Sequence, residues 1–106
     1  MNIAIRINYL DNEISLRDAL NKGYVKIIDN KLEGNDNIII SISSRLFDWN
    51  NKEIFENDLV RDNKGNIYKI IYDYGMFYFS DPQTQNIIMP ISVCKLGNKL
   101  DVEVIN

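Results

Sequence analysis

The order of apolar and polar residues in the first half of the chain predicts three β-strands. Residues 3–9 alternate between apolar and polar or small side chains, and a period of two is typical of a half-buried strand. A second strand is predicted over residues 24–28, and the β-branched run at 38–42 predicts a strand that is buried on both faces. The polar stretches at 29–37 and 43–53 are predicted to be connections.

One short helix is predicted over residues 15–23. Ser15 suits the N-cap position, because its hydroxyl can accept a hydrogen bond from a free N–H of the first turn, and Asp18 follows three residues later. Gly23 suits the left-handed residue that ends a helix. Three apolar side chains share one helix face and are expected to pack on the sheet: Leu16, Ala19 and Leu20.

The second half of the chain has the pattern of an antiparallel meander. Short apolar strands alternate with turns that contain Gly, Asn or Asp, and Gly65 lies where a hairpin loop needs a positive φ. Residues 87–96 are compatible with an edge strand or with a short helix that opens at Pro90. The predicted strands cover residues 59–61, 67–72, 76–79 and 101–105.

Several segments of this half resemble the YopX family. Residues 48–60 have the sequence DWNNKEIFENDLV, which is similar to the family pattern D-x-N-G-K-E-I-Y-E-G-D-I-V, and GNIY at 65–68 is similar to the strand that follows it. The closing EVIN at 103–106 is similar to the family's last strand. Asn51 and Asn57 stand where the family pattern has Gly, and Asn tolerates a positive φ better than most residues.

The resemblance covers residues 45–79 and the extreme C-terminus. It implies a small β-rich protein encoded by phages or prophages of Gram-positive bacteria, without an established catalytic site. The expected fold class is mainly β with a minor α component: an antiparallel meander or small SH3-like barrel with one short N-terminal helix. We expect a single domain over 1–106, made of a β-α-β-β half at 1–44 and a YopX-like β half at 45–106.

Length and composition favour a soluble cytoplasmic domain. The chain has 106 residues, of which 45% are hydrophobic and 25% charged. No apolar run reaches the roughly 18 residues that a membrane-spanning helix needs, and the N-terminus lacks the unbroken apolar stretch of a signal peptide. The one cysteine, Cys94, excludes an internal disulfide and favours a reducing compartment. The net charge of −3 argues against direct nucleic-acid binding, which depends on a basic surface.

The residue types argue against an enzyme, a bound cofactor and a metal site. Without His there is no imidazole base and no common zinc set, and neither a P-loop nor a GxGxxG motif is found. Cys94 is expected to be buried and inert. Four carboxylates could in principle hold a divalent cation, but we interpret them as turn formers and solvated charges: Glu53, Glu56, Asp58 and Asp62.

Aromatic residues of the 45–79 segment are the candidate binding site. Tyr68, Tyr72 and Tyr74 share one parity, which predicts a row of Tyr on one hairpin face. Such a row either packs in the core with its hydroxyls at the rim or forms an interface, where exposed Tyr is favoured. Trp49 either covers the core or anchors an interface. The candidate interface consists of Arg45, Phe47, Trp49, Tyr72, Tyr74 and Phe77.

The favoured hypothesis is a non-catalytic phage or prophage protein that binds a host or phage protein. Its sharpest form is counter-defence, the inhibition of a bacterial immune effector such as a CRISPR nuclease. The alternative is a sensor or sponge for a nucleotide signal, in which Tyr side chains stack on a base and basic residues meet phosphates: Arg45, Arg61, Lys64 and Lys69. That alternative needs a pocket, made most easily between subunits. Few helices cover the strand edges, so strands could also pair between copies of the chain as a homo-oligomer.

Overall fold

Strand β5 (Ile38–Phe47) joins two units of the chain, one ending at Ser41 and the other beginning at Ile42. The computed structural model describes residues 5–10 and 12–106. Each unit has its own hydrophobic cluster. The division lies close to the predicted boundary between the two halves of the chain.

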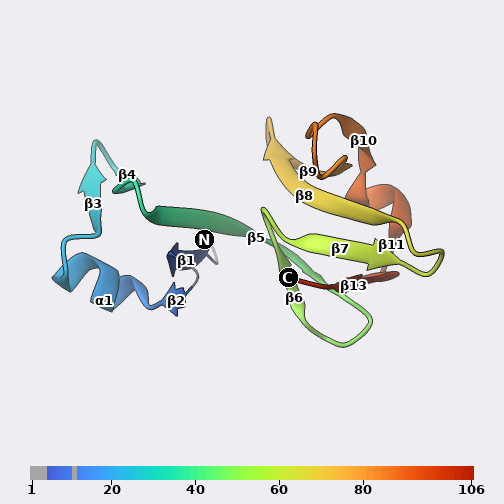
Figure 1. The fold of residues 1–106 in the computed structure, drawn as a ribbon, viewed down its shortest axis with the longest axis horizontal. Helices are drawn as coiled ribbons and strands as arrows, with labels where there is room; N and C mark the ends of the chain where they lie inside the picture. The colour runs from blue at the N-terminus through green and yellow to red at the C-terminus, as the bar shows by residue number, and fades with distance from the viewer. Residues whose placement is uncertain (1–4, 11) are drawn as a thin grey trace. The chain divides into compact units, whose positions relative to one another are not determined.

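In its described residues, 5–10 and 12–41, the first unit contains two antiparallel hairpins and one helix (Figure 1). Their bounds are β1 (Ile5–Tyr9), β2 (Asn12–Ile14), α1 (Leu16–Asn21), β3 (Val25–Ile28) and β4 (Lys31–Gly34). Residues 1–4, some of which belong to the predicted first strand, lie outside the described residues. The prediction of a connection at 29–37 was wrong, because Asp29 and Asn30 adopt positive φ and turn the chain back into a hairpin.

Helix α1 confirms the predicted start and stop signals. The Ser15 hydroxyl accepts a hydrogen bond from the Asp18 backbone N–H (3.1 Å), and Gly23 has a φ of 73°. Of its apolar face, however, Ala19 is buried while Leu16 and Leu20 are exposed. The expected packing of both leucines was wrong, because this short helix approaches the cluster of Ile7 and Val25 through its smallest apolar side chain.

The second unit contains the predicted meander. The sheet that contains it has the order β10-β9-β8-β7-β13, with every neighbouring pair antiparallel. Mainly β structure, an antiparallel meander and one short N-terminal α-helix are therefore confirmed for the described residues. The strands are β7 (Leu59–Asp62), β8 (Ile67–Asp73), β9 (Met76–Ser80), β10 (Ile87–Pro90) and β13 (Val102–Val104).

A second group of strands in this unit surrounds β5. β5 pairs antiparallel with β6 (Glu53–Phe55) and parallel with β12 (Lys99–Leu100), which pairs in turn with β11 (Lys95–Leu96). The prediction of a connection at 43–53 was wrong, because β5 continues to Phe47. Two serines stabilise this extension: the Ser43 hydroxyl bonds to the Glu53 carboxylate, and the Ser44 hydroxyl donates to the Ile54 carbonyl (2.6 Å).

Residues 87–96 combine the two structures that the sequence allowed. Strand β10 ends at Pro90, and the 3₁₀ helix η1 (Ile91–Cys94) follows directly, with Pro90 as its N-cap.

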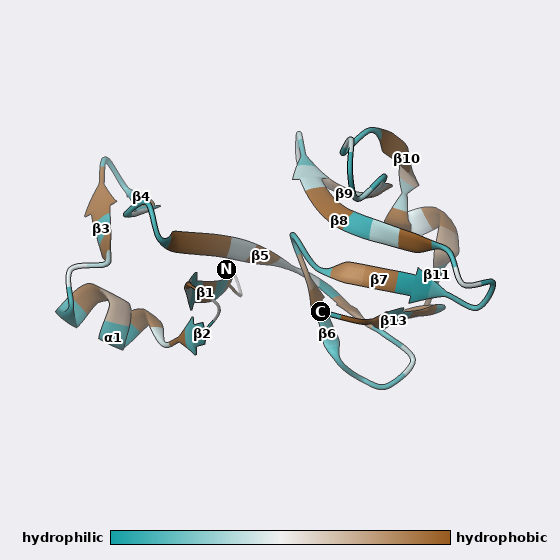
Figure 2. Cartoon of the chain, viewed as in Figure 1, coloured by the Kyte–Doolittle hydropathy of each residue, from teal (hydrophilic) through white to brown (hydrophobic). Residues whose placement is uncertain are grey.

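The expectation that residues 38–42 are buried on both faces was wrong at Ile39, which is exposed. Figure 2 shows the start of β5 as an apolar stretch. The face of β5 that carries Ile39 is exposed at that residue.

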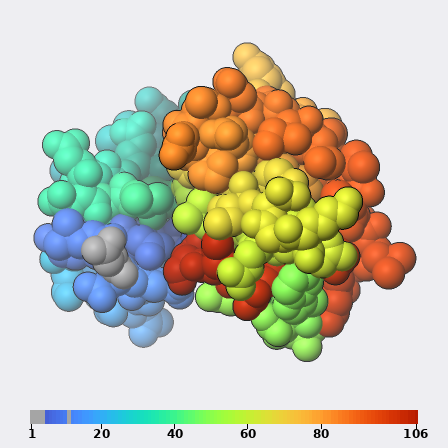
Figure 3. All heavy atoms as spheres, turned by 45° about the vertical axis from the view of Figure 1, so that its right-hand side comes forward, coloured from blue at the N-terminus to red at the C-terminus, as the bar shows by residue number. Residues whose placement is uncertain are grey.

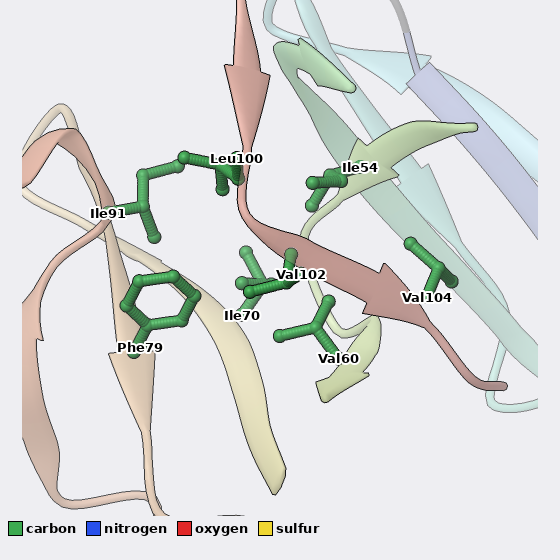
Figure 4. Packing of buried hydrophobic residues seen from close by; sticks show 8 residues of the cluster. All are labelled: Ile54, Val60, Ile70, Phe79, Ile91, Leu100, Val102 and Val104. Atoms are coloured by element: carbon green, nitrogen blue, oxygen red, sulfur yellow. The ribbon is translucent and has the colours of Figure 1, made fainter. Parts of the chain in front are cut away.

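The core of the second unit is formed by side chains from both groups of strands. Figure 4 shows the ring of Phe79 next to Ile70, with Val102 and Val60 on the other side of Ile70; these residues come from the meander and β13. Ile54, Ile91 and Leu100 come from β6, η1 and β12. No helix in residues 5–10 and 12–106 is long and apolar enough to cross a membrane.

Two buried carboxylates tie the turns of the second unit to its C-terminal residues. Asp48 accepts bonds from the backbone N–H groups of Asn50 (2.9 Å), Lys52 (2.8 Å) and Val104 (2.9 Å). Asp58 accepts from the Phe55 N–H (2.9 Å) and the Asn106 side-chain amide (2.6 Å).

The turn that each aspartate holds contains an asparagine at positive φ. Asn51 has a φ of 65° and Asn57 a φ of 75°. The sequence predicted left-handed turns at these two positions, and both are confirmed.

We predict that Asp48→Ala lowers the free energy of unfolding by about 3 kcal/mol, because it leaves three backbone N–H groups without their buried acceptor. Asp48→Asn, which keeps one acceptor oxygen, should lose less. Chemical denaturation followed by circular dichroism measures the difference. Asp36→Ala, at an exposed aspartate, is the matched control. Equal stability of Asp48→Ala and Asp36→Ala would contradict the assigned role of Asp48.

Candidate interaction surface of the second unit

Two of the predicted interface residues, Phe77 and Trp49, line separate hollows in the second unit. Tyr72 and Phe77 contact each other across β8 and β9, with ring centroids 5.0 Å apart. Phe77 also lines a hollow of about 220 Å³ together with Leu46 and Met76. Trp49 is 40% exposed and lines a hollow of about 380 Å³. The structure thus brings Tyr72 and Phe77 together and places Trp49 at another site.

The remaining predicted residues occupy less distinctive positions. Arg45 is an exposed residue with a φ of 63°, at the irregularity between β5 and β6. Phe47 is half-buried at the end of β5, where it is in register with Glu53 and Lys99. Tyr74 is 97% exposed in the turn between β8 and β9 and lines neither hollow.

The predicted row of tyrosines holds for Tyr68 and Tyr72, which share one face of β8, but not for Tyr74. The Tyr68 ring packs against Phe79, with centroids 5.2 Å apart, and its hydroxyl donates to Asp62 (3.3 Å). The Tyr72 ring contacts Phe77 on the same sheet face, whereas Tyr74 has left the strand with a φ of 47°. Parity alone failed here because β8 ends at Asp73, so the third tyrosine belongs to the turn.

No sequence pattern predicted that residues 91–96, which contain η1 and β11, belong to an interaction surface. Ser92 and Lys95 line the Phe77 hollow, and Leu96 lines the Trp49 hollow. Leu96 is 85% exposed and Val93 is 69% exposed. Figure 3 shows the residues that follow β9, coloured orange to red-orange, on the surface of the second unit.

The prediction that Cys94 is buried was wrong, because its side chain is exposed. In η1, Ile91 alone is directed into the core, and a 3₁₀ turn of three residues turns the next side chains outward. The short apolar stretch beside Pro90 predicted an edge strand or a short helix over residues 87–96. That pattern could not show which side chains face solvent.

A third hollow, of about 450 Å³, lies beside the hairpin of β7 and β8, and we call it the hairpin pocket. Residues of the hairpin and of the chain before β13 line it together, among them Asp62, Lys64, Tyr68, Cys94 and Asp101. Cys94 connects the pocket to the 91–96 segment, and Asp101 also lines the Trp49 hollow. All three hollows therefore border the same segment of chain.

Asp62 organises the hairpin at the edge of this pocket. Its carboxylate accepts bonds from the backbone N–H groups of Lys64 (3.0 Å) and Asn66 (2.9 Å), from the Asn66 amide and from the Tyr68 hydroxyl. Desolvation raises the pKa of Asp62, but these hydrogen bonds outweigh it and hold the pKa below the ordinary value of 3.8. Burial and the neighbouring Asp62 charge raise the pKa of Tyr68, so its phenol stays a neutral donor.

The four carboxylates considered as a cation site are used elsewhere. Glu53 bonds to Ser43, Asp58 holds a buried turn, and Asp62 holds the hairpin. Glu56 lies beside the Ile42 N–H (3.4 Å). In the part of the chain that the structure describes, no three Cys, Asp or Glu side chains gather as metal ligands would.

Compared with models of protein families, the chain matches none, and no curated protein matches it either. The resemblance to the YopX family stays a prediction.

We predict that the Asp62 carboxyl titrates below pH 3.8 in the folded protein. The folded pKa is depressed, so the hairpin bonds contribute stability above the unfolded pKa and lose it as the pH falls through the folded pKa. Tyr68→Phe removes one donor and should raise the pKa of Asp62 towards its ordinary value.

Carbon-detected NMR titration measures each carboxyl separately. Asp81 is the internal reference, because its pKa is also lowered, by the backbone N–H groups of Thr84 and Gln83, and Tyr68→Phe should leave it unchanged. An Asp62 midpoint above its ordinary value would show that the hydrogen bonds do not outweigh desolvation.

Proposed function

We propose that this protein is a non-catalytic interaction protein that binds another protein through its second unit. The observation that carries the proposal is the joint exposure of Trp49 and Leu96 around one hollow. Contiguous exposed apolar side chains on a soluble domain mark interaction sites, whereas single ones do not. The 91–96 segment lies at the centre of the proposed surface because it borders all three hollows.

The composition of this surface suits a protein partner. Tryptophan and tyrosine are enriched among the residues that dominate binding energy, and Trp49 and Tyr72 are each 40% exposed. Lys95 and Lys99 stand beside the apolar side chains and provide a polar rim. Strand β11 is also the last strand of its sheet, so its outer edge could pair with an extended segment.

The class of partner follows from the YopX resemblance, which implies a phage or prophage origin. We propose that such a protein acts by occupying a surface of its target. We therefore propose a host or phage protein as the partner, bound in the bacterial cytoplasm. Counter-defence is the sharpest form of this proposal, with a bacterial immune effector such as a CRISPR nuclease as the target.

A second candidate function, small-molecule binding, is favoured by the hairpin pocket, which a single chain forms. The charges that line this pocket, however, do not suit a nucleotide. The pocket is lined by two carboxylates, Asp62 and Asp101, and by one lysine, Lys64. Arg61, which was expected to meet phosphates, is paired with Glu103 at 3.0 Å.

We predict that Leu96→Asp and Trp49→Ala each weaken binding of the partner by roughly 30-fold, because truncating a central anchor costs about 2 kcal/mol. The tagged protein is used to capture its partner from host lysate, and the affinity of the purified pair is then measured by calorimetry. The matched control is Ile67→Asp, at an apolar residue with 46% exposure that lines none of the three hollows.

Circular dichroism must first show that all three variants are folded. Equal losses for Leu96→Asp and Ile67→Asp would place the interface elsewhere. Unchanged affinity of both Leu96→Asp and Trp49→Ala would reject the proposed surface.

A further inference from the structure

We infer that the hairpin pocket receives an arginine side chain of the partner protein, an inference that rests on the proposed function. The pocket combines an apolar interior, an aromatic ring and two carboxylates. Each of these features matches a different part of an arginine side chain.

The apolar part of the pocket suits the aliphatic stem of arginine. Phe79, Met89 and Val102 are among its lining residues, and the first and last of these belong to the buried core. Long basic side chains place their methylene groups along apolar surface while the charged head stays near polar groups. At about 450 Å³ the pocket falls in the range of about 300–1,000 Å³ that is typical of ligand sites, so part of the main chain also fits.

The charges of the pocket favour a cation. Asp62 and Asp101 outnumber Lys64 among the lining residues, and the lowered pKa of Asp62 keeps its charge at neutral pH. Most of the Asp62 bonding capacity is used within the hairpin, so Asp62 contributes mainly its field. Asp101 is exposed, and its Oδ2 accepts one long hydrogen bond from the Asn63 side-chain amide (3.4 Å). Asp101 therefore keeps more capacity than Asp62 to accept hydrogen bonds from a bound cation.

The aromatic ring and the carboxylates of the pocket favour guanidinium over ammonium. A guanidinium group is planar, can bond to a carboxylate through two parallel N–H donors and can stack on an aromatic ring. Tyr68 and Asp101 both line the pocket and supply the ring and the carboxylate. An ammonium group would use the carboxylate but would gain less from the ring.

The pocket is continuous with the proposed interface. Asp101 lines both the pocket and the Trp49 hollow, and Cys94 joins the pocket to the 91–96 segment. A partner that covers Trp49 and Leu96 therefore lies next to the pocket entrance. A basic residue at the margin of that contact can enter the pocket without any change in the fold.

The test uses two short peptides and the full chain labelled with ¹⁵N. One peptide is acetyl-Gly-Arg-Gly-amide, and the control replaces arginine by citrulline, which has nearly the same shape without the charge. The arginine peptide should cause saturable shifts at the amides of Asn63, Lys64, Asn66 and Asp101. The citrulline peptide should bind about tenfold more weakly, because charge-assisted hydrogen bonds are the stronger ones. Equal binding of the two peptides would overturn the inference.

Two substitutions on the pocket rim should act in opposite directions. Asp101→Asn should weaken binding of the arginine peptide, whereas Lys64→Gln should strengthen it by removing a like charge. Both residues are exposed, so neither change removes a buried contact. Unchanged affinity in both variants would also reject the inference, as would tighter binding of adenosine monophosphate than of the arginine peptide.

The captured partner separates this inference from the proposed function. If Leu96→Asp weakens the complex and Asp101→Asn leaves it unchanged, the interaction surface stands and the arginine site fails. If the arginine peptide binds but Leu96→Asp and Trp49→Ala leave the complex intact, the pocket stands and the proposed surface fails.

Discussion

The second unit depends on hydrogen bonds between two buried carboxylates and the last residues of the chain. Asp48 accepts from the Val104 N–H and Asp58 from the Asn106 side chain, while each also holds its own turn. These bonds fix β13 beside β7, where Val102 and Val104 complete the core. A buried carboxylate without its partners is strongly unfavourable, so the turns and the C-terminal strand stabilise each other.

The position of β13 also determines the proposed surface. The meander ends at β10, and the chain must return from there to pair β13 with β7. The return path is η1, β11 and β12, which place Ile91 and Leu100 in the core. The residues between them are exposed, among them Val93 and Leu96. The exposure of residues 92–96 is therefore a consequence of how the sheet is completed.

Sequence patterns predicted correctly the elements that are held by contacts between residues close in sequence. The Ser15 cap, the Gly65 hairpin and the left-handed turns at Asn51 and Asn57 depend on residues close in sequence, and all are present. The extension of β5 and the role of Asp48 depend on distant partners, such as Val104, 56 residues away, which periodicity does not reveal. The candidate site shows the same division: the aromatic contact of Tyr72 and Phe77 joins neighbouring strands, whereas the hairpin pocket joins hairpin residues to Asp101.

The distribution of charge around the 91–96 segment gives the proposed surface a direction. Lys95 lines the Phe77 hollow, and Asp62 and Asp101 give the hairpin pocket an excess of negative charge, while the Trp49 hollow contains both Lys99 and Asp101. A partner that fits must present acidic or neutral groups to the lysines and a basic side chain to the pocket. The reverse orientation would place like charges together and would be disfavoured. Apolar contacts at Trp49 and Leu96 would supply most of the affinity, and this opposed pair of charged regions would select both the partner and its orientation.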